Sequence, residues 1–352
     1  MTKALWAGLD VGVETTSLCV VDAAGTPLHE CVCRTDLKEV VSQLRFLRRR
    51  RRARIGIEAG SGIALARGLR NLGYSVDIYE TRQLSKFLRV RRNKTDATDA
   101  RGIAEAGRIG AFISKVYLKD IECQTLQSWL TIRRHIIRQR VSATNLLCRQ
   151  IEYYGGRVSR PNNLTRLRGA VRDELKKVFG TSTSEAAAEL KFLLSVCEHL
   201  MVHEYETDSR LRRLAKSNDL CRRFMTIPGV GPICALSFYA TVGEPGRFTR
   251  SSDVGPYLGL TPQVHESGLT YRKGHISKMG NSTTRCLLVQ SANLFMRHSQ
   301  PDCTLRRWVE QLERRRSRGA ARVALARKLA TIMIAMWRSG EAYQPTWIAI
   351  PY

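Results

Sequence analysis

A series of short alternating strands at the start of the chain restricts the fold most strongly. Residues 4–34 contain "ALWAGLDVG", "TSLCVVDAAG" and "TPLHECVCR", and the turn from Asp22 to Gly25 indicates a hairpin between the second and third strands. After a basic helix, "RIGIEAG", "SGIALARGLRNLG" and "YSVDIYE" predict strand, helix and strand. Antiparallel strands followed by such a unit predict a mixed sheet with helices on its faces, in an α/β domain over residues 1–118.

The pattern becomes helical over residues 119–220. Long runs such as "IECQTLQSWLTIRRHIIRQR" and "SEAAAELKFLLSVCEHL" are broken only around Gly155, Gly156 and Pro161. This predicts a helical connector built as an antiparallel hairpin or coiled coil, although an ordinary helical bundle fits the same pattern. Residues 221–352 differ again in composition, and we expect them to form a mainly helical domain.

A glycine-rich turn lies near the start of that last region. "TIPGVGP", residues 226–232, places Gly229 and Gly231 between two apolar helical stretches, as in the turn of a helix-hairpin-helix. Small residues there let backbone N–H groups approach a phosphate at the start of the next helix. A tight packing turn explains the same glycines, so both interpretations stay open.

The charge balance indicates a polyanionic partner. The chain has 58 Lys and Arg against 31 Asp and Glu, which leaves a formal net charge of +27. Such a field favours nucleic acid, either DNA or RNA. An anionic membrane surface fits less well, because the arginines are spread over the whole chain and no basic amphipathic helix adjoins a hydrophobic anchor.

Cysteines and apolar runs point to the cytoplasm. The ten cysteines lack a C-x-x-C pair, which favours buried thiols in a reducing compartment over zinc or disulfides. The start "MTKALWAGLDVG" reads as a strand instead of a signal peptide, and "LATIMIAMW" near the end is too short to span a bilayer.

Four acidic side chains are predicted to meet at one edge of the sheet. Asp10 ends the first strand, and Glu58 ends the fourth. If these strands are neighbours, the two carboxylates lie side by side. Asp96 and Asp99, which follow a predicted N-cap at Thr95, share one face at the start of a helix.

Four carboxylates without a counter-charge would repel one another, so a cation is expected among them. Oxygen-only ligands favour Mg²⁺ or Mn²⁺, and a pair of ions about 3.5–4 Å apart is the usual arrangement for cutting a phosphodiester. The nearby Arg91, Arg92 and Lys94 would then hold phosphate. Taken singly, Asp10 and Glu58 are also explained as turn residues, and acidic side chains are common at a helix start.

A candidate nucleophile, Ser267, precedes Gly268 in the last region. Basic residues follow it closely: Arg272, Lys273, His275, Lys278 and Arg285. Such cations would stabilise the charge that develops when a serine hydroxyl attacks a phosphate. By spacing alone, Ser277, Ser282 and Thr261 compete for this role, and a loop serine is more often a turn former.

The motifs together resemble a known family. Their order and spacing are those of the DEDD transposases of bacterial insertion sequences, the IS-one-ten family: "GLDVGVETTSLCVVDAAG", "GIEAGSG", "KTDATDARGIAEAG", "IPGVGPICA" and "YLGLTPQVHESG" with "RKGHISKMGN". The resemblance covers nearly the whole chain. It implies a RuvC-like domain with an RNase H-like sheet over residues 1–118, a coiled-coil connector over 119–220 and a transposase domain over 221–352.

The resemblance also implies a site and partners. The family's four acids fall on Asp10, Glu58, Asp96 and Asp99, and its nucleophilic serine falls on Ser267. Members are recombinases that form a covalent serine–DNA link on donor and target DNA. They form dimers that assemble into tetramers, with the acids of one subunit beside the serine of another, and several are guided by a structured non-coding bridge RNA. A cytoplasmic, nucleoid-associated bacterial protein is expected.

Three other interpretations remain from the residues alone. A Holliday-junction-resolving, metal-dependent endonuclease would activate water and leave Ser267 a structural role. "LDVGVETTSLCVVDAAG" is similar to the phosphate loop of sugar kinases and actin-like ATPases, but no second nucleotide-binding half follows in residues 120–352. A structural RNA-binding module would keep its activity after loss of all four acids.

Overall fold

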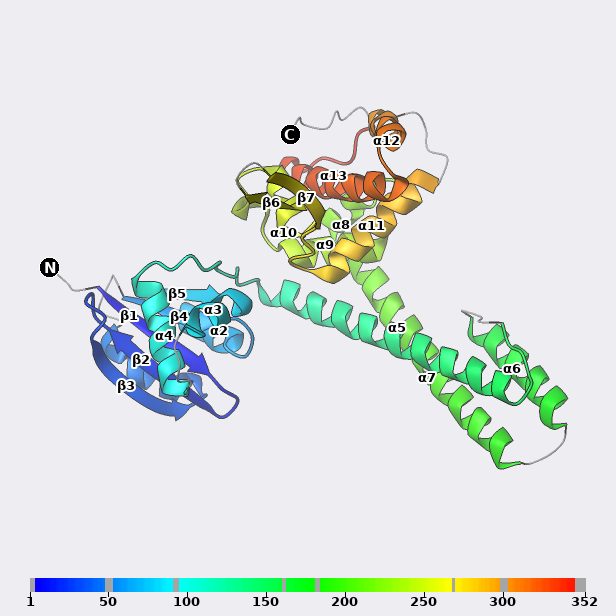
Figure 1. Cartoon of the computed structure of the whole chain (residues 1–352), viewed down its shortest axis with the longest axis horizontal. Coiled ribbons are helices and arrows are strands. Elements are labelled where there is room, and N and C mark those ends of the chain that lie inside the picture. Colours follow the sequence, from blue (N-terminus) through cyan, green and yellow to red (C-terminus); the bar gives the residue numbers. More distant parts are fainter. Residues whose placement is uncertain are drawn as a thin grey trace. The chain divides into compact units, whose positions relative to one another are not determined.

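The computed structural model divides into two compact units, residues 1–118 and 119–352 (Figure 1). The structure describes residues 4–47, 53–90, 95–159, 163–180, 184–267, 270–297 and 303–345. Each unit has a large hydrophobic core of its own.

A five-stranded sheet forms the middle of the first unit. Its strands are β1 (Leu5–Val11), β2 (Thr15–Val21), β3 (Pro27–Arg34), β4 (Ala53–Glu58) and β5 (Val76–Tyr79), in the order β3-β2-β1-β4-β5. β1, β2 and β3 are antiparallel, whereas β4 runs parallel to β1 and β5 parallel to β4. The prediction of a mixed sheet with its first and fourth strands as neighbours is confirmed.

Helices cover both faces of this sheet. They are α1 (Leu37–Leu44), the 3₁₀ helix η1 (Arg45–Leu47), α2 (Ile63–Asn71), α3 (Thr81–Leu88) and α4 (Asp96–Arg108). Alternation along the strands divides the core. Leu5 and Leu9 of β1 pack in one cluster with α1 and α2, and Cys19 of β2 packs in another with Ala100 and Ala104 of α4.

Two glycines let α4 lie directly on the sheet. A β-carbon on Gly8 of β1 would come within 2.0 Å of the carbonyl oxygen of Ala100, and one on Gly56 of β4 within 3.0 Å of Ile103. The two glycines are register partners on neighbouring strands, so together they clear a strip for the helix. This strip fixes α4 against the strand ends that carry the first two predicted acids.

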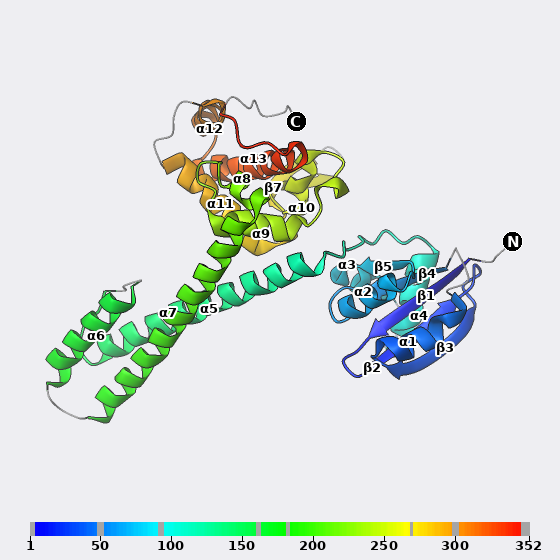
Figure 2. The ribbon, with the colours of Figure 1, turned by 180° about the vertical axis from the view of Figure 1, so that it is seen from behind.

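Two long antiparallel helices begin the second unit. They are α5 (Ile121–Tyr153) and α7 (Glu185–Ser217), and the shorter α6 (Leu164–Phe179) packs against α7 (Figure 2). The ion pairs Arg133–Asp208 and Arg140–Glu204 join α5 to α7. Residue numbers rise on one helix as they fall on the other, which is the antiparallel arrangement predicted from the sequence.

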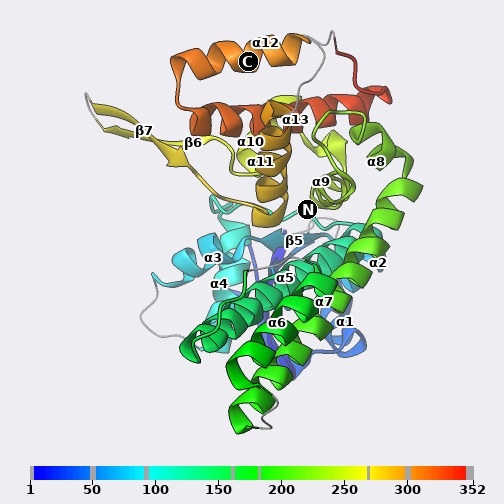
Figure 3. The same ribbon diagram turned by 90° about the vertical axis from the view of Figure 1, so that its right-hand side faces the viewer.

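The rest of the second unit is a mainly helical body, as predicted. Its elements are α8 (Asp219–Phe224), α9 (Pro232–Val242), η2 (Pro245–Arg247), η3 (Ser251–Asp253), α10 (Val254–Tyr257), β6 (Pro262–Ser267), β7 (Thr270–Ile276), α11 (Ser282–Arg297), α12 (Thr304–Arg315) and α13 (Arg318–Ser339). α9 is almost completely buried, and α11 packs against both α9 and α13. Figure 3 shows β6 and β7 as a ribbon that projects from these helices, a feature not predicted from the sequence.

Cysteines and apolar helices contribute to the cores. All ten cysteines are free thiols, and seven of them are buried. Within the described ranges, none of the helices combines the length and the apolar composition needed to cross a bilayer.

Candidate functional site

Asp10 and Glu58 lie side by side at the ends of two parallel strands. The register of β1 and β4 ends at the pair Leu9–Ile57, and the two acids are the next residue on each strand. The glycines two residues earlier face α4. Because side chains alternate along a strand, both carboxylates leave the sheet on the face that α4 covers.

The first turn of α4 carries the other two acids. The Thr95 hydroxyl accepts a hydrogen bond from the backbone N–H of Thr98 at 3.2 Å, and the Thr98 hydroxyl accepts one from the N–H of Thr95 at 2.9 Å. The predicted N-cap at Thr95 is therefore confirmed. This capping box starts the helix at Asp96 and places Asp96 and Asp99 where the positive end of the helix dipole stabilises acidic side chains.

The direction of α4 aims this acidic turn at the end of β1. A β-carbon on Gly107, in the last turn of α4, would lie 3.3 Å from Trp6 near the start of β1. The middle of β1 meets the middle of α4 at Gly8. Moving toward the end of β1 thus means moving toward the start of α4, so Asp10 points to the helical turn that carries Asp99.

The four acids share this region without forming a ready-made metal cage. Across the described ranges, no three His, Cys, Asp or Glu side chains are close enough together to hold a metal ion. Asp96 is exposed, and Asp10, Glu58 and Asp99 are half-buried. Their oxygen-only donor set suits Mg²⁺ or Mn²⁺. The convergence of all four carboxylates on a cation stays a prediction.

Ser267 ends an exposed β-ribbon. It is the last residue of β6 and pairs with Thr270 at the start of β7. Every residue of β6 is exposed. A hydroxyl in this position is accessible to a substrate as large as a DNA duplex.

Two glycines lock the base of this ribbon, where two chain segments cross. Gly259 and Gly280 have φ values of +66° and +72°, a region that favours glycine. A β-carbon on Gly259 would lie 2.4 Å from the backbone nitrogen of Met279, and one on Gly280 would lie 2.1 Å from the carbonyl oxygen of Tyr257. The Lys278 N–H also donates to the Gly259 carbonyl at 3.2 Å. The ribbon therefore leaves the helical body from a fixed crossing.

Arg285 clamps the same crossing. Its Nη1 atom donates to the carbonyl oxygens of Leu258 at 2.9 Å and Met279 at 2.8 Å, and the residue is only 9% exposed. A buried guanidinium that already donates to two backbone carbonyls is poorly placed to hold a phosphate. Arg285 is thus a structural cation of the ribbon base, which corrects its predicted role in nucleic-acid binding.

The other predicted phosphate contacts have open surroundings where the structure describes them. Arg272 and Lys273 are exposed on β7, and Lys278 is exposed just after it, with φ of 54°. Their contact with phosphate stays a prediction. The predicted contacts Arg91, Arg92 and Lys94 lie outside the described residues.

The two glycines of the "TIPGVGP" turn have different roles. Gly229 has φ of +83°, and a β-carbon there would lie 2.5 Å from the carbonyl oxygen of Ser291 in α11, so it is a packing glycine. Gly231 is exposed, and a β-carbon on it would meet nothing within 4 Å. It is the N-cap of α9, with Pro232 as the first helical residue. The predicted approach of a phosphate therefore applies to Gly231 alone.

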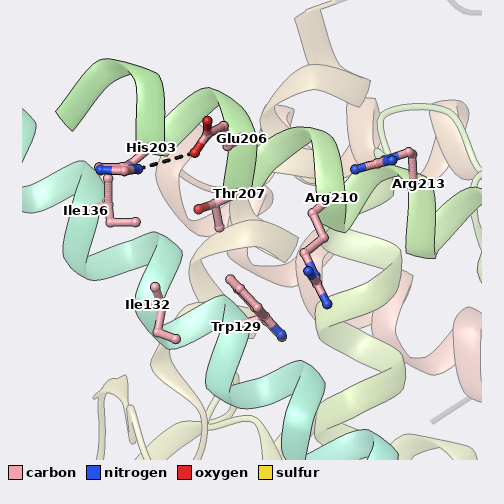
Figure 4. Close-up of a pocket in the computed structure, with 8 residues that line it drawn as sticks. All are labelled: Trp129, Ile132, Ile136, His203, Glu206, Thr207, Arg210 and Arg213. Atoms are coloured by element: carbon pink, nitrogen blue, oxygen red, sulfur yellow. Dashed lines mark hydrogen bonds and ion pairs between the residues drawn. The ribbon is translucent and has the colours of Figure 1, made fainter. Parts of the chain in front are cut away.

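A pocket between α5 and α7 is a surface that was not predicted. Figure 4 shows it as a space of about 420 Å³ lined by Trp129, Ile132, Ile136, His203, Glu206, Thr207, Arg210 and Arg213. The guanidinium carbon of Arg210 lies 4.5 Å from the ring centre of Trp129, within the range of a cation–π contact. The sequence signal for it is the helical spacing of the three α5 residues, which puts an aromatic and two aliphatic side chains on one face.

Comparison with known proteins gives matches along the chain. Residues 7–154 match a DEDD transposase family model, and residues 221–306 match the model described as "Transposase IS116/IS110/IS902 family". The transposase for insertion sequence element IS1111A of Coxiella burnetii is 30% identical over 346 residues, which are 96% of this chain and 90% of that protein. A probable family 20 transposase of Pseudomonas aeruginosa is 30% identical over 350 residues, 96% of this chain and 98% of that protein. The transposase for insertion sequence element IS1328 of Yersinia enterocolitica is 28% identical over 79% of this chain and 81% of that protein.

Proposed function

Because this chain belongs to the IS116/IS110/IS902 family of transposases, which makes it an enzyme that cuts and joins DNA, we propose that it moves an insertion sequence by serine chemistry. In this proposal Ser267 attacks a DNA phosphodiester and keeps the strand end as a phosphoserine until the end is exchanged. The element is then excised and inserted without free hydrolysis.

The observation that carries the proposal is the register of β1 and β4. It supports a shared site because Asp10 and Glu58 lie side by side on the face that meets the acidic first turn of α4. Neighbouring carboxylates repel one another unless a cation or a proton intervenes. Acids gathered at one sheet edge of a chain with a net charge of +27 fit a metal-dependent site better than a structural role.

Mg²⁺ is the proposed cofactor, with Mn²⁺ as a substitute. Its ligands would be Asp10, Glu58, Asp96 and Asp99, whose carboxylate oxygens are the donors that these hard cations prefer. When bound, such an ion stabilises the negative charge that develops on the phosphate. The capping box at Thr95 holds two of these donors in one helical turn.

The serine half of the site would be completed by cations. Arg272, Lys273 and Lys278 are exposed on or beside the ribbon that carries Ser267, and they would bind the DNA backbone. The N–H groups at the start of α9, next to Gly231, and the basic segment with Arg91, Arg92 and Lys94 would add further phosphate contacts. The locked base of the ribbon supports a fixed path for the serine.

We assign the first unit to the RNase H-like, RuvC-like class, which its mixed sheet and helical faces support. Donor and target DNA and a structured non-coding bridge RNA are the proposed partners, and the high positive charge suits several polyanions at once. Dimers that assemble into tetramers would bring the acids of one subunit beside the Ser267 of another.

Substitution of Ser267 tests the proposal. The full chain is mixed with DNA carrying the joined ends of its element and with RNA transcribed from the element's non-coding ends. Ser267→Ala should lose both DNA cutting and the detergent-stable protein–DNA adduct, whereas Ser277→Ala, a change at a competing serine, should keep both. If Ser267→Ala still cuts the DNA, the serine mechanism is wrong and a metal-dependent, junction-resolving endonuclease is favoured.

A further inference from the structure

One face of the β6–β7 ribbon brings His265, Ser267 and Arg272 together. Directly opposite residues of an antiparallel pair point to the same side of the sheet, and so do residues two apart on one strand. The register pairs His265 with Arg272 and Ser267 with Thr270. His265 and Ser267 therefore share their face with the guanidinium-bearing Arg272.

The opposite face holds a separate set of side chains. Glu266 pairs there with Tyr271, and Val264 pairs with Lys273. The Lys273 Nζ lies 5.6 Å from the ring centre of Tyr271, two residues away on the same strand. This contact shows that side chains two residues apart on this ribbon come close to each other.

His265 and Ser267 are also two residues apart, with Cα atoms about 6.5 Å from each other by strand geometry. An imidazole ring is long enough to cover most of that distance and place a ring nitrogen beside the serine hydroxyl. Both side chains are exposed, and within the described part of the chain neither has a hydrogen-bond partner. The imidazole can therefore turn toward the hydroxyl without breaking an existing contact.

We propose that His265 is a catalytic residue that accepts the proton of the Ser267 hydroxyl when the serine attacks DNA. The inference rests on the proposed serine mechanism and adds the base which that mechanism needs. Imidazole suits the task because it exchanges protons near neutral pH. The adjacent carboxylate, Glu266, is on the opposite face of the ribbon.

The proposed step balances in atoms and charge. The proton of the Ser267 hydroxyl passes to a ring nitrogen of His265 as the Oγ–P bond forms, and the bond from phosphorus to one deoxyribose oxygen breaks. The leaving oxygen takes up a proton from water, and it returns that proton to water when it attacks in the exchange. The serine then regains its proton from the imidazolium, while Arg272 faces the phosphate oxygens throughout.

The test compares variants of the two ribbon faces in the adduct assay with joined-end DNA and element RNA. His265→Asn should slow adduct formation by about 100- to 10,000-fold near neutral pH, the usual contribution of a general base. Its rate should rise steadily with pH, whereas the wild-type rate should level off once the imidazole is neutral. DNA affinity should not change. Glu266→Gln, on the other face, should form the adduct at the wild-type rate.

Two further variants separate the explanations. If His265 is only a cation that holds phosphate, His265→Arg keeps the wild-type rate, and that result overturns the proposal. A wild-type rate in His265→Asn overturns it as well, provided that Ser267→Ala forms no adduct. An adduct that survives Ser267→Ala instead overturns the serine mechanism itself, so the two failures are distinguishable.

Discussion

Gly8 of β1 lies directly under Ala100 of α4, so close that a β-carbon on the glycine would be 2.0 Å from the Ala100 carbonyl oxygen. This contact sets the height of the helix above the sheet. It also sets the distance between the acids at the strand ends and those in the first helical turn. The packing of a residue without a side chain thus controls the proposed metal site.

Gly8→Ala should push α4 away from the sheet. The nearest atoms belong to the helix backbone, which cannot rotate aside, so we expect a loss of about 1–3 kcal/mol in the free energy of unfolding of the first unit. Amide hydrogen exchange in β1 and α4 should become faster, and metal-dependent cleavage should fall.

Gly169→Ala is the matched control for this change. It lies inside α6, where a β-carbon would meet nothing within 4 Å, so the helix should gain about 0.5–1 kcal/mol. Exchange rates in β1 and α4 that are the same in Gly8→Ala and in the wild type would contradict the close packing.

Asp99→Asn should weaken the binding of Mn²⁺ while leaving α4 folded. The change removes one charge and keeps the shape of the side chain, and we expect a loss of at least about tenfold in metal affinity, because even groups that only support ligands contribute that much. Titration calorimetry with Mn²⁺ measures the loss. Asp36→Asn, at the N-cap of α1, should bind Mn²⁺ like the wild type. Unchanged metal-dependent cleavage in Asp99→Asn would remove Asp99 from the site.

Local signals in the sequence are enough to predict the first unit and its acids. Strand alternation and turn residues are short-range features, and they place Asp10 and Glu58 at strand ends before any tertiary contact is known. The cap at Thr95 is equally local, because its hydrogen bonds span three residues. The neighbouring positions of the two strands follow from the strand–helix–strand order.

Roles that depend on distant contacts are not predictable in this way. Arg285 resembles the exposed basic residues before it in the sequence, yet it donates to Leu258, 27 residues away. Gly229 and Gly231 differ only because α11 packs against the first of them. The pairing of His265 with Arg272 likewise requires the register of a ribbon in a region that we expected to be mainly helical.

The pH dependence of stability should reveal the buried amine of Lys119. Burial lowers the pKa of Lys119 to about 8, from an ordinary value of 10.5. Between these two pH values the unfolded chain keeps a proton that the folded chain has released, so raising the pH through this window stabilises the fold. Relative to Lys119→Met, the wild type should gain up to about 3 kcal/mol in unfolding free energy between these pH values. A difference that does not change with pH would contradict the burial of this amine.

Salt dependence should separate Arg272 from Arg285. Affinity for DNA and RNA should fall steeply with salt, because bound cations displace counterions from phosphates, and Arg272→Gln should reduce the slope of log affinity against log salt by about 0.9. Arg285→Met should leave that slope unchanged, because its guanidinium faces the carbonyls of Leu258 and Met279. It should instead destabilise the ribbon base by about 1–3 kcal/mol, the usual effect of leaving buried acceptors without a donor. Fluorescence anisotropy over a salt series measures the slopes. Equal slope losses in the two variants would restore Arg285 as a phosphate contact, and a flat wild-type response would contradict the role of the net positive charge.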